Sequence, residues 1–276
     1  MLDQEAVARL TAALVSRAGG YLRNPVRQER VTCAVCTTPV DGYERCFQCN
    51  RHLAYDGLAE AVAFLTYAVA GQQSGYVMRG YKARRPVDEH VAIVTLLVLL
   101  ALSAHWNCPA VLAGAPVTHW ATVPSLPAQP GEHPLHQILS KFVPGPEIRL
   151  AAAASAQHPR DVNPEHFSTN AHLSQGSHVL LIDDTWTGGG HAQSAVLTLR
   201  RAGATHVSLL VVARWIKEDY GDNAKFIRDL SSQDYDPEVC PWTGVLPEAI
   251  GEIGELTRSH QAAVHHQAPR GSDDRN

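Results

Sequence analysis

The stretch that most constrains the fold lies between His178 and Ala213, where two apolar runs enclose a glycine-rich turn and a helical pattern. "HVLLI" predicts a buried strand, "HAQSAVLTLRRAG" carries apolar residues at helical spacing, and "THVSLLVVA" predicts the next strand. Gly203 follows the last helical turn, where helices commonly end. Such a unit joins parallel strands by a right-handed crossover. The sequence therefore predicts an α/β fold with a mostly parallel sheet flanked by helices.

The remaining chain divides into further predicted elements. Apolar periodicity predicts helices at 1–20, 53–70 and 91–104, and strands at 110–113 and 120–126. The segment 71–86 is predicted to be a connection, and its basic residues are interpreted as a solvated turn: Arg79, Lys82, Arg84 and Arg85. Residues 127–166 are rich in proline and glycine, which predicts an irregular lid or a disordered segment. Within it, "RLAAAASAQ" is consistent with either a short helix or a short strand.

A cysteine module, "CAVCTTPVDGYERCFQC", precedes the predicted sheet. Two C-x-x-C pairs can offer four thiolates to one tetrahedral ion, so we expect a closed, structural Zn²⁺ site formed by Cys33, Cys36, Cys46 and Cys49. Rubredoxin-like iron and redox-active thiols are the alternatives. His52 is interpreted as a surface histidine, and Cys108 and Cys240 as buried thiols without a second ligand at C-x-x-C spacing. A closed site predicts that the metal folds the module and takes no part in catalysis.

Two acids and three glycines follow the strand that begins at His178. Asp183 and Asp184 are placed at the carboxyl end of a strand, where α/β proteins bind ligands. The glycines lead into a helix N-terminus, whose amides and dipole favour phosphate. The chain lacks the lysine of a P-loop, and Gln193 stands where a dinucleotide fingerprint needs glycine. A tight turn with one capping acid would explain only part of the pattern. A ligand with a phosphate at one end and hydroxyls or a divalent cation at the other is expected.

The stretch "VLLIDDTWTGGGHAQSAVLTLRRAGA" resembles the PRPP-binding motif of type I phosphoribosyltransferases, and the cysteine module makes the chain similar to the ComF-like branch of that family. "ATVPSLP" resembles the strand and turn before the pyrophosphate loop, and "RDVN" resembles an Arg-x-x-Asn element that includes Arg160. The resemblance covers most of residues 31–215. It implies a transferase in which a nitrogenous acceptor displaces pyrophosphate at C1 of PRPP with help from Mg²⁺.

The resemblance also implies roles for individual residues. Asp183 and Asp184 would be the catalytic acids and bind the ribose hydroxyls, directly or through Mg²⁺. Residues 127–166 would form a hood over the reaction, with Ser125 near the pyrophosphate. The 5-phosphate would be held by the loop formed by Thr185, Thr187, Gly188, Gly189, Gly190 and His191. Gly188 and His191 stand where the family carries hydroxyl residues, so two phosphate-binding hydroxyls are missing and the backbone amides remain. For His133, His136 and Arg160, a solvated loop side chain is the preferred interpretation over a role in the site.

A second hypothesis is a non-catalytic PRPP- or nucleotide-binding protein whose zinc ribbon contacts nucleic acid or a partner protein. The formal net charge of -4 argues against a protein that coats nucleic acid along its whole surface, and the local charge of +2 over residues 1–90 supports nucleic-acid binding only weakly. The start of the chain lacks a secretory pattern, and the apolar run at 91–106 is shorter than the ~20 residues of a membrane span. A cytoplasmic protein without a membrane segment is expected, and a homodimer is left open. The expected parts are a helical segment at 1–30, the zinc-ribbon module at 31–52, the α/β domain at 53–215 with its hood at 127–166, an extension at 216–262 and a disordered tail at 263–276.

Overall fold

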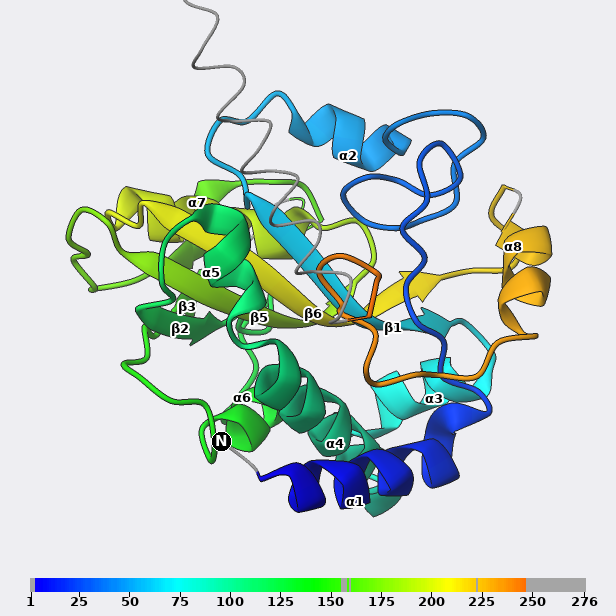
Figure 1. Ribbon diagram of the computed structural model, residues 1–276. Coiled ribbons are helices and arrows are strands. Elements are labelled where there is room, and N and C mark those ends of the chain that lie inside the picture. Colours follow the sequence, from blue (N-terminus) through cyan, green and yellow to red (C-terminus); the bar gives the residue numbers. More distant parts are fainter. Residues whose placement is uncertain (1–2, 155–157, 159, 222, 247–276) are drawn as a thin grey trace, which may run out of the picture.

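A computed structural model describes residues 3–154, 158, 160–221 and 223–246, and it shows an α/β protein built on a parallel sheet (Figure 1). The four strands lie in the order β1-β6-β5-β2 and all neighbours are parallel: β1 (Ala61–Val69), β6 (His206–Ile216), β5 (His178–Trp186) and β2 (His119–Thr122). Helix α7 (Gly190–Arg201) connects β5 to β6. The predicted strand–helix–strand unit is therefore confirmed.

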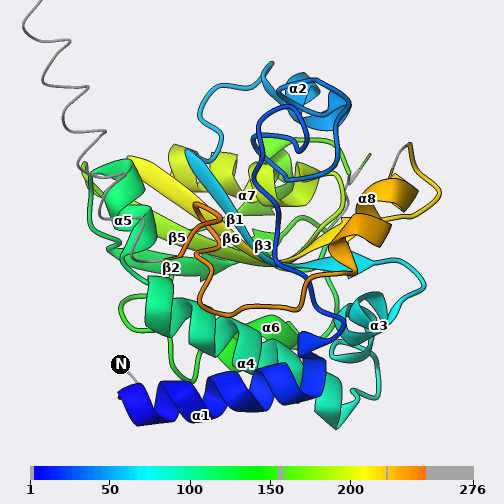
Figure 2. The same ribbon diagram turned by 45° about the vertical axis from the view of Figure 1, so that its right-hand side comes forward.

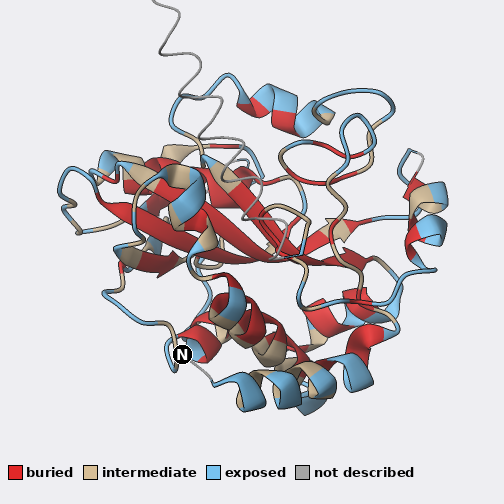
Figure 3. Ribbon diagram, viewed as in Figure 1, coloured by how far each residue is buried: buried red, intermediate tan, exposed pale blue. Residues whose placement is uncertain are grey.

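Helices cover both faces of the sheet (Figures 1 and 2). Alternate residues of β5 point to opposite faces, so Leu180 and Ile182 pack with one layer and Val179 and Leu181 with the other. The first layer contains α1 (Gln4–Leu14), η1 (Val15–Gly19), α3 (Gln73–Gly80), α4 (Asp88–His105) and α6 (Pro134–Leu139). The second contains α7 and the cysteine module with α2 (Phe47–His52). The strands are buried along almost their whole length (Figure 3).

Helix α4 is, among the described residues, the one helix long and apolar enough to cross a membrane by length and composition. Its mean hydropathy is 1.5. However, Ile93, Leu97 and Leu100 are buried in the core that it shares with α1, α3 and the sheet. A core helix that packs in this way is compatible with a soluble protein, and the predicted helix at 91–104 is confirmed.

Two predicted elements have the wrong secondary structure. Residues 61–69, expected within a helix, form β1, because a strand buried on both faces is continuously apolar and can imitate helical spacing. The β-branched and aromatic side chains in "AVAFLTYAV" favour the strand. Residues 110–113, expected as a strand, belong to helix α5 (Cys108–Ala113). Pro109 in its first turn and the left-handed Gly114 at its end are typical helix boundary residues.

The expected loops also contain regular structure. The connection at 71–86 includes α3. The hood at 127–166 includes α6, β3 (Ala151–Ala152) and η2 (Pro164–His166), and η2 leads into β4 (Phe167–Ser168). Strands β3 and β4 form a separate antiparallel pair. The extension from residue 216 contains α8 (Asn223–Leu230) and then a segment that we call the C-terminal strap, residues 231–246. The predicted disordered tail at 263–276 lies outside the described residues.

Candidate functional site

The acid pair lies near the carboxyl-terminal ends of β5 and its neighbour β2. Ile182 pairs with Thr122, the last residue of β2. Because the two strands are parallel, Asp183 and Ser125 both follow this pair at the carboxyl-terminal end of the sheet. The strand continues through the two acids to Trp186, which holds their backbone in the sheet. Asp183 and Asp184 are each 8% exposed, so both carboxyl groups are largely removed from water.

Asp184 is the centre of a polar cluster. Its Oδ2 atom accepts a hydrogen bond from the Tyr81 hydroxyl at 2.8 Å and one from Lys82 Nζ at 2.6 Å. His133 Nε2 lies 3.4 Å from the same oxygen, while His133 Nδ1 accepts from the Leu135 amide at 3.2 Å. The histidine proton therefore belongs on Nε2, facing the carboxylate. Three donors from two separate segments, residues 81–82 and His133, hold the orientation of this single carboxylate.

The two acids have opposite pKa shifts. Burial alone would raise the pKa of Asp184, but the hydrogen bond from His133 and the charge of Lys82 outweigh it and hold the pKa well below its usual range. Burial and the neighbouring Asp184 charge raise the pKa of Asp183 to about 8. At neutral pH the pair therefore carries one firmly ionised carboxylate beside a carboxyl group that retains its proton. Such a pair can accept hydrogen bonds at one acid and donate one at the other.

The glycines of the loop have different structural tasks. Gly189 has a left-handed φ of 86°, and a Cβ there would lie 2.1 Å from the Trp186 ring. A Cβ on Gly190 would lie 1.9 Å from the Arg160 carbonyl oxygen. A Cβ on Gly188 would have no atom within 4 Å. Gly189 and Gly190 are therefore required by packing, whereas Gly188 faces open space and is the glycine that leaves room for a ligand.

The other predicted loop residues surround the N-terminus of α7. Thr187 is exposed, and Thr185 is half-buried with its Oγ1 atom buried and without a hydrogen-bond partner among the described residues. His191 occupies the first turn of α7, directly after Gly190. Arg160 contributes its backbone to this region, and its side chain is exposed. Loop, helix N-terminus and acid pair thus adjoin one another at the end of β5.

Several residues expected to be solvated make specific contacts in the structure. Lys82, placed in a solvated turn by its sequence context, pairs with Asp184, and Arg79 lies 4.8 Å from the centre of the Trp215 ring. His133 reaches Asp184, and the buried His136 stacks on Trp120 with its Nε2 2.8 Å from Glu147 Oε1. The interpretation as a solvated loop side chain is wrong for His136, which is buried, and for His133, which is half-buried, because α6 folds against the sheet. Lys82 and Arg79 are exposed as expected, although each has a specific partner. No local sequence signal distinguishes Lys82 from the neighbouring Arg84 and Arg85, so only the fold reveals its partner.

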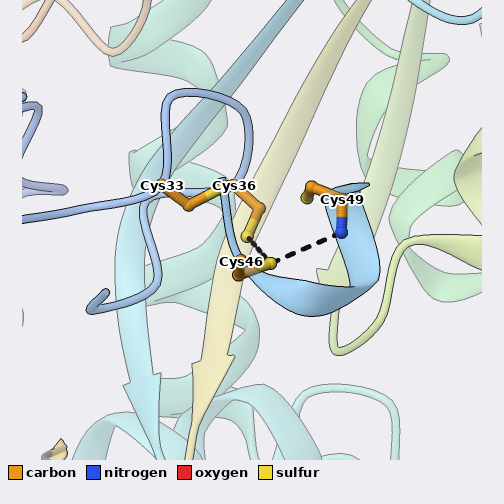
Figure 4. Close-up of side chains that lie close together, drawn as sticks. All are labelled: Cys33, Cys36, Cys46 and Cys49. Atoms are coloured by element: carbon orange, nitrogen blue, oxygen red, sulfur yellow. Dashed lines mark hydrogen bonds between the residues drawn. The ribbon is translucent and has the colours of Figure 1, made fainter. Parts of the chain in front are cut away.

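The second candidate site is the four-cysteine cluster (Figure 4). The sulfur atoms of Cys33, Cys36, Cys46 and Cys49 all lie within 4.8 Å of one another, and Cys36 Sγ is 3.6 Å from Cys46 Sγ. Four thiolates ~2.3 Å from a tetrahedral zinc ion would be separated by about 3.8 Å, so the cluster fits one such ion. Cys46 caps the N-terminus of α2 and Cys49 lies in that helix, so the second C-x-x-C pair spans a helix start. His52, expected on the surface, is buried, and burial lowers its pKa.

Arg214 connects the two candidate sites, and sequence reasoning missed it. This buried side chain donates from Nε to the Cys36 carbonyl oxygen at 3.0 Å. Its Nη1 atom donates to the carbonyl oxygens of Trp186 and Thr187 at 3.0 and 3.1 Å. A charged residue within the apolar run of β6 was the available sequence signal. One guanidinium thus links the cysteine module to the loop that follows the acid pair.

Fold and sites together define an α/β protein with a four-cysteine cluster that could bind one metal ion and a buried acid pair beside a glycine loop. Comparison with known proteins finds no matching family model and no significantly similar curated protein.

Proposed function

We propose that the chain is a PRPP-dependent phosphoribosyltransferase that uses Asp183 and Asp184 to bind the ribose and the α7 N-terminus to bind the 5-phosphate. The observation that carries this proposal is the adjacency of the buried acid pair to the Gly188 opening at a helix N-terminus. Phosphate is favoured by the free amides and the dipole of the helix. Hydroxyl groups suit a carboxylate pair of which one member donates and the other accepts.

In the proposed reaction, positive charge develops on the ribose as its C1 bond to pyrophosphate breaks. The Asp184 carboxylate is preorganised by Tyr81, Lys82 and His133, so it can stabilise that charge without rearranging. Lys82 places an ammonium group at the same edge of the sheet, where it would attract the leaving pyrophosphate. Helix α6, which carries His136 and follows His133, lies within the hood segment that would exclude water.

Magnesium suits part of this donor set. The three hydrogen-bond donors of Asp184 converge on Oδ2, so Oδ1 of Asp184 would hold the ion together with Asp183, which would release its proton when the metal binds. Bound Mg²⁺ would supply electrostatic stabilisation of the pyrophosphate. The acceptor is a nitrogenous nucleophile whose identity the residues of the site do not specify.

The test is PRPP binding by calorimetry with Mg²⁺, followed by pyrophosphate release with a panel of nucleobases and amines. Asp184→Asn should reduce turnover by at least about 100-fold, because a preorganised charge that stabilises the transition state is removed. Asp229→Asn, an exposed change on α8, is the matched control and should leave both measurements unchanged. Equal binding and turnover by the parent and the Asp184→Asn protein would rule out this assignment.

A second candidate function is a non-catalytic PRPP-binding protein whose cysteine module contacts single-stranded nucleic acid. The observation that favours it is a group of exposed aromatic rings on the module: Tyr43 is 71% exposed and Phe47 is 70% exposed. The Arg51 guanidinium lies 5.9 Å from the centre of the Phe47 ring. Exposed rings beside basic groups are the usual platform for stacking bases.

The two candidates differ in measurable ways. The binding protein would retain PRPP without releasing pyrophosphate, and it would bind single-stranded oligonucleotides with an affinity that falls as salt rises. Phe47→Ala should then weaken oligonucleotide binding by roughly 5- to 100-fold, as expected for the loss of one stacked base. Val111→Ala, which truncates an exposed side chain on α5, should have no effect. Oligonucleotide binding unaffected by Phe47→Ala would reject this second candidate.

A further inference from the structure

A second group of side chains that could bind a metal ion is separate from both the acid pair and the four-cysteine cluster. It has no role in the proposed reaction. His105 ends α4, Cys108 begins α5, and Cys240 lies in the C-terminal strap. Cys108 Sγ is 3.8 Å from His105 Nδ1 and 3.7 Å from Cys240 Sγ, and the three ligand atoms all lie within 4.8 Å of one another. These separations are close to the ~3.5–3.8 Å between ligands on one tetrahedral zinc ion.

The sequence spacing repeats that of the first cluster. His105 and Cys108 form an H-x-x-C pair, which has the same spacing as the C-x-x-C pairs. By cysteine spacing alone, Cys108 and Cys240 have no C-x-x-C partner. In the structure, His105 supplies a second ligand atom beside Cys108, at the same three-residue spacing as in a C-x-x-C pair.

The turn after Cys240 has the same backbone hydrogen bonds as the turn after Cys33. In each turn the cysteine amide donates to the carbonyl five residues later, at 2.8 Å for Cys33 and 2.9 Å for Cys240. The amide four residues later donates back to the cysteine carbonyl, at 3.0 and 2.8 Å respectively. That fourth residue has a left-handed φ in both turns, 54° at Thr37 and 78° at Gly244. The turn that begins at Cys240 therefore has the same backbone conformation pattern as the turn that begins at Cys33.

Thr243 occupies the position in this second turn that Cys36 holds in the first, three residues after the leading cysteine. Its Oγ1 atom is buried and has no hydrogen-bond partner among the described residues. The same is true of His105 Nε2. A cavity of ≈ 10 Å³, lined in part by His105 and Cys240, adjoins the group. This volume suits one water molecule, so the fourth position of a tetrahedral ion can be filled by water or by the Thr243 hydroxyl.

We propose that His105, Cys108 and Cys240 bind a second Zn²⁺ ion, which fastens the C-terminal strap to the corner between α4 and α5. Two thiolates, one neutral imidazole and Zn²⁺ sum to zero charge, which suits a site where His105 is 3% and Cys240 0% exposed. A monovalent Cu⁺ ion would leave a net negative charge in the same apolar surroundings. The strap runs from α8 back to α4, α5 and β1 (Figure 2), so the ion would join segments 132 residues apart.

A disulfide between Cys108 and Cys240 is the competing explanation for the two sulfurs. A disulfide requires neither the nearby imidazole of His105 nor a turn like the one after Cys33, so those two observations favour the metal. The described cysteines are all unpaired by disulfides. Zinc and disulfide give different counts of metal and of free thiols, which makes them separable in one preparation.

The experiment measures zinc and thiol content of the full chain purified without added metal or chelator. We expect two zinc ions per chain and, after denaturation with chelator, all six cysteine thiols in reduced form. Cys240→Ala and His105→Ala should each lower the zinc content from two ions to one. His119→Ala, a half-buried histidine at the start of β2, is the matched control and should keep both ions. Cobalt substitution should show thiolate charge-transfer intensity for six sulfur ligands in the parent and four when Cys108 and Cys240 are both replaced by Ala.

Thr243→Cys provides a test that does not depend on a damaging substitution. It would complete a His-Cys₃ ligand set in the existing turn and should slow zinc loss to a competing chelator by about tenfold or more, while Thr243→Val should not. One zinc ion per chain with six free thiols would overturn the proposal. So would one zinc ion with four free thiols, which would show a disulfide in place of the metal.

Discussion

Asp183 and Asp184 are adjacent in sequence and equally buried, yet their surroundings assign them different protonation states. Asp184 faces Tyr81, Lys82 and His133, whereas Asp183 accepts a hydrogen bond from the Asp184 amide at 2.8 Å. Strand geometry explains the difference, because consecutive side chains in a strand point to opposite faces. The chemistry of the pair therefore follows from the alternation of β5 and from the separate segments that each face meets.

Gly188 offers a direct test of the phosphate loop at the scale of one residue. Gly188→Ser restores the hydroxyl that the resembling motif carries, and its Cβ has open space. One added hydrogen bond to a charged phosphate should tighten PRPP binding by about 5- to 30-fold, measured by calorimetry. Gly188→Ala, which adds the Cβ without the hydroxyl, should not tighten binding. Equal affinities for the Ser and Ala variants would contradict a phosphate at this position.

His178 predicts a pH dependence of stability. This buried side chain lies 2.8 Å from the Ala115 carbonyl oxygen and 2.9 Å from Ser208 Oγ, and burial lowers its pKa from 6.5. Above about pH 6.5 the histidine is neutral in both folded and unfolded chains. Below that pH the unfolded chain binds a proton that the folded chain excludes. The free energy of unfolding should therefore fall as pH decreases, with this residue contributing at most about 1.4 kcal/mol per pH unit.

The measurement is urea denaturation between pH 5 and pH 8, compared with His178→Asn. The variant lacks the titrating group and should show a shallower loss of stability below about pH 6.5. His172→Asn, at an exposed position, serves as the control and should follow the parent. A parallel pH dependence in the parent and the His178→Asn protein would show that His178 contributes nothing to it.

At the scale of elements, β6 connects the cysteine module to the glycine loop that follows the acid pair. Arg214 projects from β6 and donates to carbonyl groups of both segments. The neighbouring Tyr67 of β1 adds a second tie to the module by donating from its hydroxyl to the Thr37 carbonyl oxygen at 2.7 Å. The module is therefore attached to β1 and β6, and through Arg214 also to the loop that follows the acid pair.

Arg214→Met should weaken both attachments. Carbonyl oxygens of Cys36, Trp186 and Thr187 would each lose a charged donor in a buried region. We expect a loss of about 2–4 kcal/mol in the free energy of unfolding, together with weaker PRPP binding and faster zinc release to a chelator. Arg228→Met on the exposed side of α8 should change none of these three quantities. Unaltered zinc release in Arg214→Met would show that the guanidinium does not support the metal module.

At the scale of the whole molecule, the cysteine module shares one apolar core with the sheet. Cys33, Cys36 and Cys49 belong to the same buried cluster as Phe64, Trp186 and Val211. A separate module at 31–52 would be expected to have a core of its own. The shared core means that metal occupancy should affect the stability of the α/β core as well as that of the module.

Removal of metal from the Cys240→Ala protein tests this coupling, because that variant retains only the four-cysteine site. Dialysis against chelator should lower its Tm by more than about 5 °C, since a structural zinc ion contributes folding free energy to everything that it holds together. Re-addition of Zn²⁺ should restore the Tm, whereas Mg²⁺ should not. An unchanged Tm at zero zinc content would separate the module from the core.

The sequence by itself determined the elements whose signals are local. The strand–helix–strand unit, the placement of the acid pair before a glycine loop and the convergence of the four cysteines depend on spacing within short stretches, and all three are present in the structure. The phosphoribosyltransferase activity stays a prediction. Segments 53–70 and 110–113 were misassigned because a strand buried on both faces and a short helix give ambiguous apolar patterns.

Only the tertiary structure decided which distant residues meet. Lys82 and His133 reach Asp184 from segments 102 and 51 positions away in the numbering, and Cys240 reaches Cys108 from 132 positions away. Such contacts depend on how helices pack on a sheet and leave no periodic trace in the chain. A charged side chain in a loop has the same sequence signature whether it is solvated or buried against a carboxylate. Burial, which sets its charge partner and its chemistry, is a property of the folded molecule alone.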